Sequence, residues 1–302
     1  MKKFFYSQKK KYKKKLLILI LFVINFILIQ IYQKKEKKLR ICLCIIGKKE
    51  NLYAKEFIEH YKKLGYNKIF IYDNNDINDE RFEEIIQDEI NNGFVSIINY
   101  RGYKLPQQLS SYKDCYEKNN LAYNWLSFFD FDEYLELKPK NITIQNFLSH
   151  ERYHYCQIIK INWICYSNYK NLYYDKKPIQ QRFFSSIQPD KHIKSTVRGN
   201  LPTNYWQNAG TPHSSRNKFN SCSSSGKMID FSSPFNDPPD IKYAFLKHYH
   251  YKSFEEFCIK LKRGKPDQDN HDLILRLKSF YQQNKYDLNK LNIMNKVFNL
   301  TL

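Results

Sequence analysis

The stretch Trp125-Leu126-Ser127-Phe128-Phe129-Asp130-Phe131-Asp132-Glu133-Tyr134-Leu135 sets an apolar, aromatic run directly against three acids. A short apolar run of this kind is typical of a buried strand, and ligands bind at strand ends in open α/β sheets. Carboxylates beside so much apolar surface are costly to leave unpaired. Two of them at i and i+2 can share one hard cation, or one can bind the cation and the other a sugar hydroxyl. The segment therefore predicts a cation and diphosphate site, with a strand end that turns polar at the surface as the alternative.

Strands and helices alternate along the chain from the end of the N-terminal tail to residue 130. The spacing predicts strands at 41–46, 68–72, 94–100 and 125–130, with helices at 50–64, 79–92 and 107–119 between them. This rhythm is typical of βαβ units, so we expect an α/β fold with a Rossmann-like, mainly parallel sheet and flanking helices. The chain has neither Gly-x-Gly-x-x-Gly nor a P-loop, which argues against dinucleotide and P-loop sites.

Beyond residue 140 the alternation weakens. A partly alternating run predicts a strand at 155–163, and residues 208–240 are rich in Ser, Asn, Pro and Gly, which predicts long loops. A further strand is expected at 241–251. Ser253 then precedes a helix and has Glu256 three residues later, the spacing of a capping box.

A second acid follows the second predicted strand, at Asp73, with Asn75 close behind. Because parallel strands end at the same edge of a sheet, we expect Asp73 on the same side as Asp130 and Asp132. One carboxylate could then address the ribose or base of a nucleotide while the other pair holds a cation on its diphosphate. The alternative is that 73–76 is a turn in which Asn and Asp are favoured for their backbone preferences.

Histidines and basic residues in the second half could complete such a site. His213 lies in a predicted loop and His248 in a predicted strand, and either could join carboxylates around a borderline cation such as manganese. Structural histidines are the alternative. Lys191, Lys194 and Arg198 form a basic cluster that could neutralise a diphosphate, unless it is a solvated loop.

The net charge of +20 is concentrated at the N-terminus. Residues 1–40 hold 13 Lys and Arg against the single acid Glu36, which accounts for +12 of the total. The remaining charge is modest for the length, so a basic nucleic-acid groove is not expected.

Residues 16–31 are almost all Leu, Ile, Val and Phe, and eight lysines precede them. A helix of these 16 residues would span roughly 24 Å, which suits the thinner bilayers of the early secretory pathway. Positive-inside asymmetry then leaves the N-terminus cytosolic and the rest lumenal. A cleaved signal peptide is the alternative, but the flank after Gln30 lacks the small residues of a cleavage site. We expect a single-pass type II protein of the Golgi or endoplasmic reticulum membrane.

The seven cysteines include no Cys-x-x-Cys pair, and an odd count leaves at least one free thiol if others pair in a lumen. Cys42 and Cys44 alternate within an apolar run, so we expect strand core rather than a redox pair. Asn141-Ile142-Thr143 and Asn299-Leu300-Thr301 are acceptor tripeptides for N-glycosylation and fit a lumenal address.

Five motifs follow one another between residues 40 and 265. They are Tyr53-x-x-Glu56-x-Ile58-Glu59-His60-Tyr61-x-x-Leu64-Gly65, Ile69-Phe70-Ile71-Tyr72-Asp73-Asn74-Asn75, Gln108-x-x-x-Tyr112-x-Asp114-Cys115, Trp125-x-x-Phe128-x-Asp130-x-Asp132-Glu133, and His248-Tyr249-x-x-Lys252-Ser253-x-Glu255-Glu256-Phe257 with Arg263-Gly264. This ordered set resembles glycosyltransferase family 92 and its relatives among the family 2-like transferases.

The resemblance implies a GT-A fold, a nucleotide-sugar donor such as a UDP-sugar, and manganese or another divalent cation bound through Asp-x-Asp. It also implies transfer to a glycan hydroxyl, typically of galactose and with inversion. Carried over, Asp130 and Asp132 bind metal and donor, and His248 is a later metal or diphosphate contact. Asp73 and Asn75 would contact the nucleotide end of the donor, and Lys194 and Arg198 its diphosphate. Lys194 and Arg198 belong to a Lys-Ser-x-Val-Arg element, which His213 follows. Gly199 stands where relatives tend to have Pro.

The N-terminal charge and apolar run, together with the span of the resemblance, give the expected organisation. We expect a cytosolic tail at 1–15, a transmembrane anchor at 16–32, a stem at 33–39, the catalytic domain at 40–265 and a helical extension at 266–302. Inversion needs a carboxylate base on the acceptor side, for which the residues are Glu133, beside the acid pair, or Asp175, Asp230 and Asp237 in the variable region. A membrane-tethered glycan-binding protein with a degenerate transferase site is the alternative function.

Overall fold

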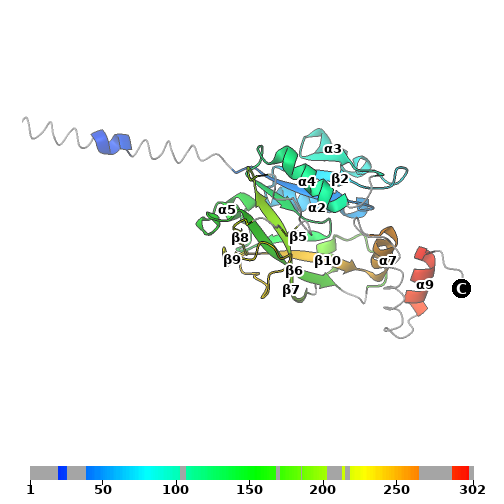
Figure 1. Ribbon diagram of the computed structural model, residues 1–302. Coiled ribbons are helices and arrows are strands. Elements are labelled where there is room, and N and C mark those ends of the chain that lie inside the picture. Colours follow the sequence, from blue (N-terminus) through cyan, green and yellow to red (C-terminus); the bar gives the residue numbers. More distant parts are fainter. Residues whose placement is uncertain are drawn as a thin grey trace, which may run out of the picture. The chain divides into compact units, whose positions relative to one another are not determined.

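The computed structural model describes residues 20–25, 39–102, 107–167, 171–184, 186–202, 213–214, 218–264 and 288–298 (Figure 1). Met1–Lys38 and Leu39–Leu302 form two separate compact units. In the first unit residues 20–25 are helical, and no helix within the described ranges is both long and apolar enough to cross a membrane. Most of the predicted anchor lies outside the described residues, as do the predicted tail at 1–15 and residues 33–38 of the predicted stem.

The first half of the second unit is a parallel sheet with helices on both faces. Its strands lie in the order β3 (Val95–Asn99), β2 (Lys68–Asp73), β1 (Ile41–Gly47) and β4 (Trp125–Phe128), all parallel. The helices α2 (Asn51–Lys63), α3 (Glu83–Asn91) and α4 (Gln107–Asn119) connect them. These elements confirm the predicted βαβ order, although α3 begins four residues later than predicted.

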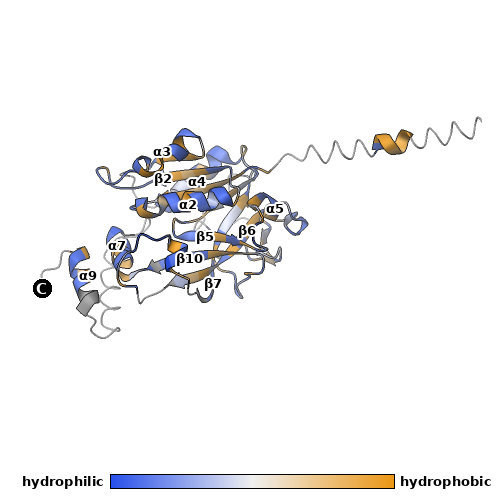
Figure 2. Ribbon diagram, turned by 180° about the vertical axis from the view of Figure 1, so that it is seen from behind, coloured by the Kyte–Doolittle hydropathy of each residue, from blue (hydrophilic) through white to orange (hydrophobic). Residues whose placement is uncertain are grey.

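β1 is buried on both faces, and its two alternating sets of side chains enter different cores. Ile41, Leu43 and Ile45 pack in one cluster with Phe57 and Tyr61 of α2. The set Cys42, Cys44 and Ile46 packs in the other cluster with Tyr112 and Tyr116 of α4. Each helix therefore has one apolar and one polar side. Figure 2 shows this along α3, which carries both the orange of hydrophobic and the blue of hydrophilic residues. Leu52, near the start of α2, is exposed.

The second half of the sheet is mixed, so the prediction of a mainly parallel sheet is only partly right. β7 (Ser186–Arg198) runs antiparallel to both β4 and β6 (Ile158–Ser167), and β10 (Ala244–Lys252) runs parallel to β6. β5 (Glu133–Leu137) closes this side by pairing antiparallel with β10. β7 was missed because its lysines and a bulge hide the alternation of a strand. Short elements of this half are α5 (Ile144–Leu148), η1 (Glu151–Tyr153), α6 (Ile179–Arg182), β8 (Ser221–Cys222) and β9 (Met228–Ile229).

The connection from β4 to β5 forces the sheet to curl. The two strands are consecutive in sequence, yet β7, β6 and β10 lie between them in the sheet order. In a flat sheet four strand spacings would separate them by about 19 Å, whereas five residue steps from Phe128 to Glu133 reach at most about 18 Å when fully extended. Residues 129–132, which carry Asp130 and Asp132, therefore cross over one side of β7, β6 and β10.

Two disulfides join elements of the second unit. Cys44–Cys115 ties β1 to α4, and Cys156–Cys222 ties the segment before β6 to β8. Cys42, Cys165 and Cys258 are free thiols. The expectation that Cys42 and Cys44 do not form a redox pair with each other is confirmed, since Cys42 is core and Cys44 binds a distant partner.

α7 (Phe254–Arg263) begins with the predicted capping box between Ser253 and Glu256. The carboxylate of Glu256 also accepts from the guanidinium of Arg182 at 2.7 and 3.0 Å and from the hydroxyl of Tyr53 at 2.6 Å. This buried network fixes α7 against α2. α9 (Leu288–Phe298), the described part of the predicted C-terminal extension, packs on α7 through Ile293 and Val297.

Gly47 ends β1 where Phe131 of the acid-bearing crossing packs down on it. A β-carbon at this position would lie 2.4 Å from Cε2 of Phe131 and 2.9 Å from Cζ of Phe82. We predict that Gly47→Ala lowers the free energy of unfolding by about 1–3 kcal/mol, because it overpacks a filled core. Urea denaturation of the purified chain measures this.

The matched control is the pair Gly47→Ala with Phe131→Leu, which removes the colliding ring edge. The two changes touch the same space, so their effects on stability should be non-additive, with the double variant less destabilised than the sum. Simple additivity would show that Phe131 does not fix the crossing against β1.

Candidate active site

The acid-bearing crossing brings three carboxylates together. Asp132 and Glu133 are buried, and the side chain of Asp130 is 32% exposed. One oxygen from each of the three lies within 4.8 Å of the others. Like charges at this separation repel one another, so cations or protons must offset them.

Lys194 of β7 offsets two of the three acids. Its ammonium nitrogen lies 2.6 Å from Oδ2 of Asp130 and 3.6 Å from Oε1 of Glu133. Burial alone would lower the pKa of Lys194, but Asp130 and Glu133 outweigh it and raise the pKa to about 12. Asp130 is further held by Gln108 Nε2 at 2.9 Å and by the hydroxyl of Tyr112 at 3.0 Å, both from α4.

Glu133 is in the interior of the cluster. One carboxylate oxygen accepts the backbone N–H of Asp130 at 3.0 Å, which bends the crossing back on itself. Burial raises the pKa of Glu133 well above its ordinary value; Lys194 opposes that shift, and Asp130 and Asp132 add to it. A fully buried carboxyl with these partners suits a structural role, and nothing places it where an acceptor hydroxyl could reach it.

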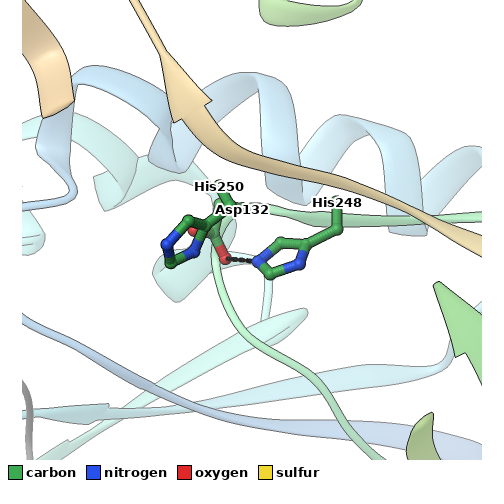
Figure 3. Close-up of side chains that lie close together, drawn as sticks. All are labelled: Asp132, His248 and His250. Carbon is green, nitrogen blue, oxygen red and sulfur yellow. Dashed lines mark ion pairs between the residues drawn. The ribbon is translucent and has the colours of Figure 1, made fainter. Parts of the chain in front are cut away.

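Asp132 faces α7 and β10 instead of β7. Its Oδ2 lies 2.5 Å from Nζ of Lys260, and its Oδ1 lies 3.6 Å from Nε2 of His248 (Figure 3). Burial alone would raise the pKa of Asp132, but Lys260 and His248 hold it well below its ordinary value. Burial lowers the pKa of His248, against the opposing effect of Asp132. These shifts favour a charged carboxylate and a neutral imidazole, the protonation states of metal ligands.

His250 completes a second group of possible ligands. One nitrogen or oxygen from each of Asp132, His248 and His250 lies within 4.8 Å of the others. The predicted metal residues Asp132 and His248 are thus neighbours, and His250 was missed as a third. His213 belongs to neither group found among the described residues. Its buried ring lies 6.2 Å from that of Tyr112, and burial lowers its pKa.

Asp73 lies at the rim predicted for it. β2 and β4 both run parallel to β1, with Asp73 paired to Gly47 and Phe128 paired to Cys44. The acids therefore share one edge of the sheet, two strand spacings or roughly 10 Å apart. Asp73 already has partners, since Oδ1 accepts from Asn75 and Oδ2 from Arg101 at 2.7 Å. The contact of Asp73 and Asn75 with a nucleotide stays a prediction.

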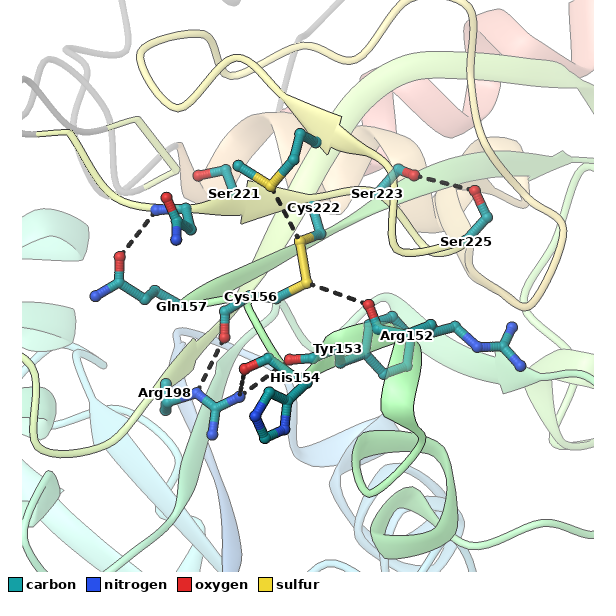
Figure 4. Close-up of a disulfide and its surroundings, with 12 residues drawn as sticks. Arg152, Tyr153, His154, Cys156, Gln157, Arg198, Ser221, Cys222, Ser223 and Ser225 are labelled. Carbon is teal, nitrogen blue, oxygen red and sulfur yellow. Dashed lines mark hydrogen bonds between the residues drawn. A yellow bond between two sulfur atoms is a disulfide. The ribbon is translucent and has the colours of Figure 1, made fainter.

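The structure does not bring Arg198 to the acids. Arg198 pairs with Trp125 at the start of β4, whereas Asp130 follows the end of that strand. Its guanidinium lies 4.5 Å from the ring of Trp125 and donates to the carbonyl oxygens of Tyr153 and Cys156, each at 3.0 Å (Figure 4). Arg198, predicted as a donor contact, therefore lies at the wrong end of β7, four positions along the strand from Lys194.

Comparison with known families decides the affiliation of the chain. The sequence profile described as glycosyltransferase family 92 matches residues 37–272, well over half of the chain. The chain belongs to glycosyltransferase family 92. The predicted resemblance is thereby confirmed.

Curated family 92 proteins of Oryza sativa subsp. japonica, Ricinus communis and Arabidopsis thaliana are 25%, 28% and 30% identical to this chain over 114, 108 and 111 residues. These matches cover 38%, 35% and 34% of this chain and 19%, 18% and 18% of the relatives. The match thus spans about a fifth of the length of each relative.

Solved structures of transferases show a weaker likeness. Residues 1–349 of S. aureus TarS, in complex with UDP-GlcNAc, align with a TM-score of 0.37 and 11% identity over 85% of this chain and 79% of that one. The mannosyltransferase PcManGT of Pyrobaculum calidifontis, in complex with GDP-Man and Mn²⁺, aligns at 0.30 and 8% over 42% and 36%. The α/β description of this family 92 chain rests on its own strand order.

Sequence reasoning missed Lys260, which has the shortest contact with Asp132. On α7 it reads as one more exposed lysine of a polar helix, and no local pattern marks a contact 128 residues away. The only available signal was its position one helical turn after Glu256, within the last motif shared with family 92.

Lys194 should be essential to the stability of this family 92 chain. We predict that Lys194→Met lowers the free energy of unfolding by about 3–5 kcal/mol, because it leaves buried acids without their cation. Chemical denaturation measures the loss. Lys113→Met, which removes an exposed pair with Glu117, should cost no more than about 0.5 kcal/mol.

A second variant separates charge from lost packing. If the uncompensated carboxyl of Glu133 is the cause, Lys194→Met combined with Glu133→Gln should recover part of the stability. A double variant as unstable as Lys194→Met alone would assign the loss to packing of the lysine stem.

Proposed function

We propose that this family 92 chain transfers a sugar from a nucleotide-sugar donor, a UDP-sugar such as UDP-galactose, to a hydroxyl of a glycan, with inversion and with a divalent cation. The observation that carries the proposal is the meeting of Asp130 and Asp132 with His248 and Lys194 at the sheet rim that also holds Asp73. Acids, imidazole and ammonium converge there from four separate strands or connections.

The donor set fits manganese. Asp132, His248 and His250 offer one carboxylate and two imidazoles, and borderline cations accept nitrogen beside oxygen. Lys260 now pairs with Asp132, and its side chain is 23% exposed, so a flexible stem can withdraw toward solvent. A cation held by these residues would polarise the diphosphate and stabilise the leaving nucleotide.

The chain's own cations support the same chemistry. Lys194 and Lys260 flank the acids from β7 and α7, and their ammonium groups are placed to meet charge that develops on a departing diphosphate. Asp130 and Asp132 hold these lysines in position before any ligand binds. On this proposal the nucleoside lies on the β2 side of the rim, near Asp73, and the sugar lies toward β7 and β6.

A glycan-binding protein with a degenerate site is the alternative. A degenerate site is expected to lack at least one of the groups that bind metal or donor. Here Asp130, Asp132 and His248 are all present and close together. This favours the enzyme. UDP with Mn²⁺ separates the two, since a pure lectin should ignore the mixture.

We further propose that the chain is a type II protein whose catalytic domain lies in the lumen of the Golgi or endoplasmic reticulum. The apolar residues 16–32 after eight lysines support the anchor. Two disulfides support an oxidising compartment.

Asp132→Asn tests the enzymatic proposal. We expect the purified wild-type chain to release UDP from a UDP-sugar in the presence of Mn²⁺ and to stop when EDTA is added. Asp132→Asn should lower the rate at least about 100-fold while the far-UV circular dichroism stays unchanged, because the amide binds a cation far more weakly than the carboxylate. Asp76→Asn, an exposed acid on the same rim, is the matched control and should keep the rate.

The lumenal proposal has its own test. Asn141 is exposed, and Thr143 of its tripeptide also caps α5, so the site is on the surface of the folded domain. In a secretory host we predict an electrophoretic shift that a glycan-removing amidase abolishes and that Asn141→Gln reduces by the contribution of one glycan, since Asn299 is a second acceptor. Thr143→Ser preserves both the acceptor and the cap and should keep the shift. An unmodified Asn141 in a chain that reaches the lumen would contradict an accessible surface site.

A further inference from the structure

A bulge interrupts β7 where it pairs with β6. Asn162 of β6 pairs with Ile193, but the next residue, Trp163, pairs with Asp190, so residues 191 and 192 are extra. Bulges of this kind re-aim side chains and are frequent beside active sites. The buried amide of Asn162 holds the bulge, donating to the carbonyl oxygens of Asp190 and Lys191 at 3.1 and 3.2 Å.

The bulge places His192 against Trp163, whose indole lies between His192 and the residues that contact the acids. Its imidazole stacks on the indole of Trp163, with centroids 4.9 Å apart and planes at 15°. The same indole lies 4.2 Å from the ring of His248 and 5.9 Å from the ammonium of Lys194. His192 therefore belongs to the same side of the sheet as the residues that contact Asp130 and Asp132.

His192 is paired in the manner of an oriented base. Nδ1 lies 2.5 Å from Oδ1 of Asp190, and the same carboxylate accepts the backbone N–H of His192 at 2.8 Å. The ring is held from its other side by Phe235, at 4.8 Å. The His192 side chain is 46% exposed, so Nε2, which has no hydrogen-bond partner among the described residues, is open to a ligand. A carboxylate on Nδ1 fixes the tautomer that leaves Nε2 as proton acceptor.

Two further nitrogens point to a ligand at this place. Nε1 of Trp163 and Nδ1 of His248 are buried and have no hydrogen-bond partner within the described part of the chain. Such groups are costly unless something polar meets them. Sugar hydroxyls supply both donors and acceptors.

The carboxylates first considered as bases do not lie here, and the expectation of a carboxylate base gives way to an imidazole, which can serve as general base as well. Glu133 is fully buried behind Lys194. Asp175 pairs with Lys177, and Asp230 accepts from Ser232. Neither these two nor Asp237 contacts Trp163 or His248 in the described ranges, and all three lie on loops.

We propose that His192 is the catalytic base of the transfer and that Asp190 is its positioning residue. The proposal rests on the proposed glycosyltransferase function. Nε2 of His192 takes the proton as the O–H bond of the acceptor hydroxyl breaks. The acceptor oxygen forms its bond to the anomeric carbon from the side opposite the diphosphate, and the bond from that carbon to the diphosphate oxygen breaks, its electron pair leaving with UDP. Asp190 stabilises the imidazolium that results.

The test compares donor binding with turnover in the full-length chain. Binding of UDP with Mn²⁺ is followed by tryptophan fluorescence, and UDP release is measured with whichever of UDP-galactose, UDP-glucose and UDP-GlcNAc the wild-type chain turns over, water serving as acceptor. We expect His192→Gln to lower kcat by about 10²–10⁴-fold with the Kd for UDP–Mn²⁺ within about twofold. Asp190→Asn should lower kcat with little change in KM, and Gln188→Ala, exposed on the same strand, should match the wild type.

Rescue separates a base from a structural residue. In His192→Ala, added imidazole should restore part of kcat, which no loss of packing would allow. A His192→Gln chain that binds UDP–Mn²⁺ and turns over at the wild-type rate overturns the base while the proposed function stands. An absence of imidazole rescue together with lost UDP–Mn²⁺ binding also overturns it. A wild-type chain that neither binds UDP–Mn²⁺ nor releases UDP contradicts the proposed function itself, and the base with it.

Discussion

The ammonium of Lys194 between Asp130 and Glu133 is the interaction on which the rest of the structure depends. The chain must pass from β4 to β5 in four residues across a sheet that would be too wide if flat. The crossing carries carboxylates into a largely apolar interior, where isolated charges are not tolerated. Lys194 reaches them from β7, so the same contact that neutralises the acids also holds the curl closed.

Buried ion pairs of this kind add little to stability compared with apolar packing, because desolvation offsets most of the attraction. These ion pairs are better explained by the arrangement of charged groups that they hold in place. The pKa of Asp132 is held low by Lys260 and His248, burial lowers the pKa of His248, and the ammonium of Lys260 lies beside the Asp132 carboxylate. These charged groups are held in place by one another in the absence of any ligand, so under the proposed function little reorganisation is needed when charge develops on a leaving group.

The first half of the fold and half of the site could be predicted because they depend on local periodicity. β1, β2 and β4 are short apolar runs, and the rule that parallel strands end at one edge was enough to place Asp73 beside Asp130. The second half could not, because β7 carries lysines and a two-residue bulge that conceal its alternation. Arg198 was grouped with Lys194 by closeness in sequence, but in a strand four residues cover roughly 13 Å. The contact of Lys260 with Asp132 and the stacking of His192 on Trp163 join distant elements, which no local pattern encodes.

The bond between Cys44 and Cys115 links the site to the chemistry of its surroundings. Cys115 lies on α4, the helix whose Gln108 and Tyr112 grip Asp130, and Cys44 lies on β1, between the strands that carry the acids. The bond links residues 71 apart in sequence. In the entropic picture it raises the free energy of unfolding by about 4 kcal/mol, because it restricts the unfolded chain. A chain made in a reducing cytoplasm would lose this restraint on α4 and, with it, part of the grip on Asp130. Recombinant material from such a host would then be a poor guide to the native enzyme, and its oxidation state would need to be measured before any assay is interpreted.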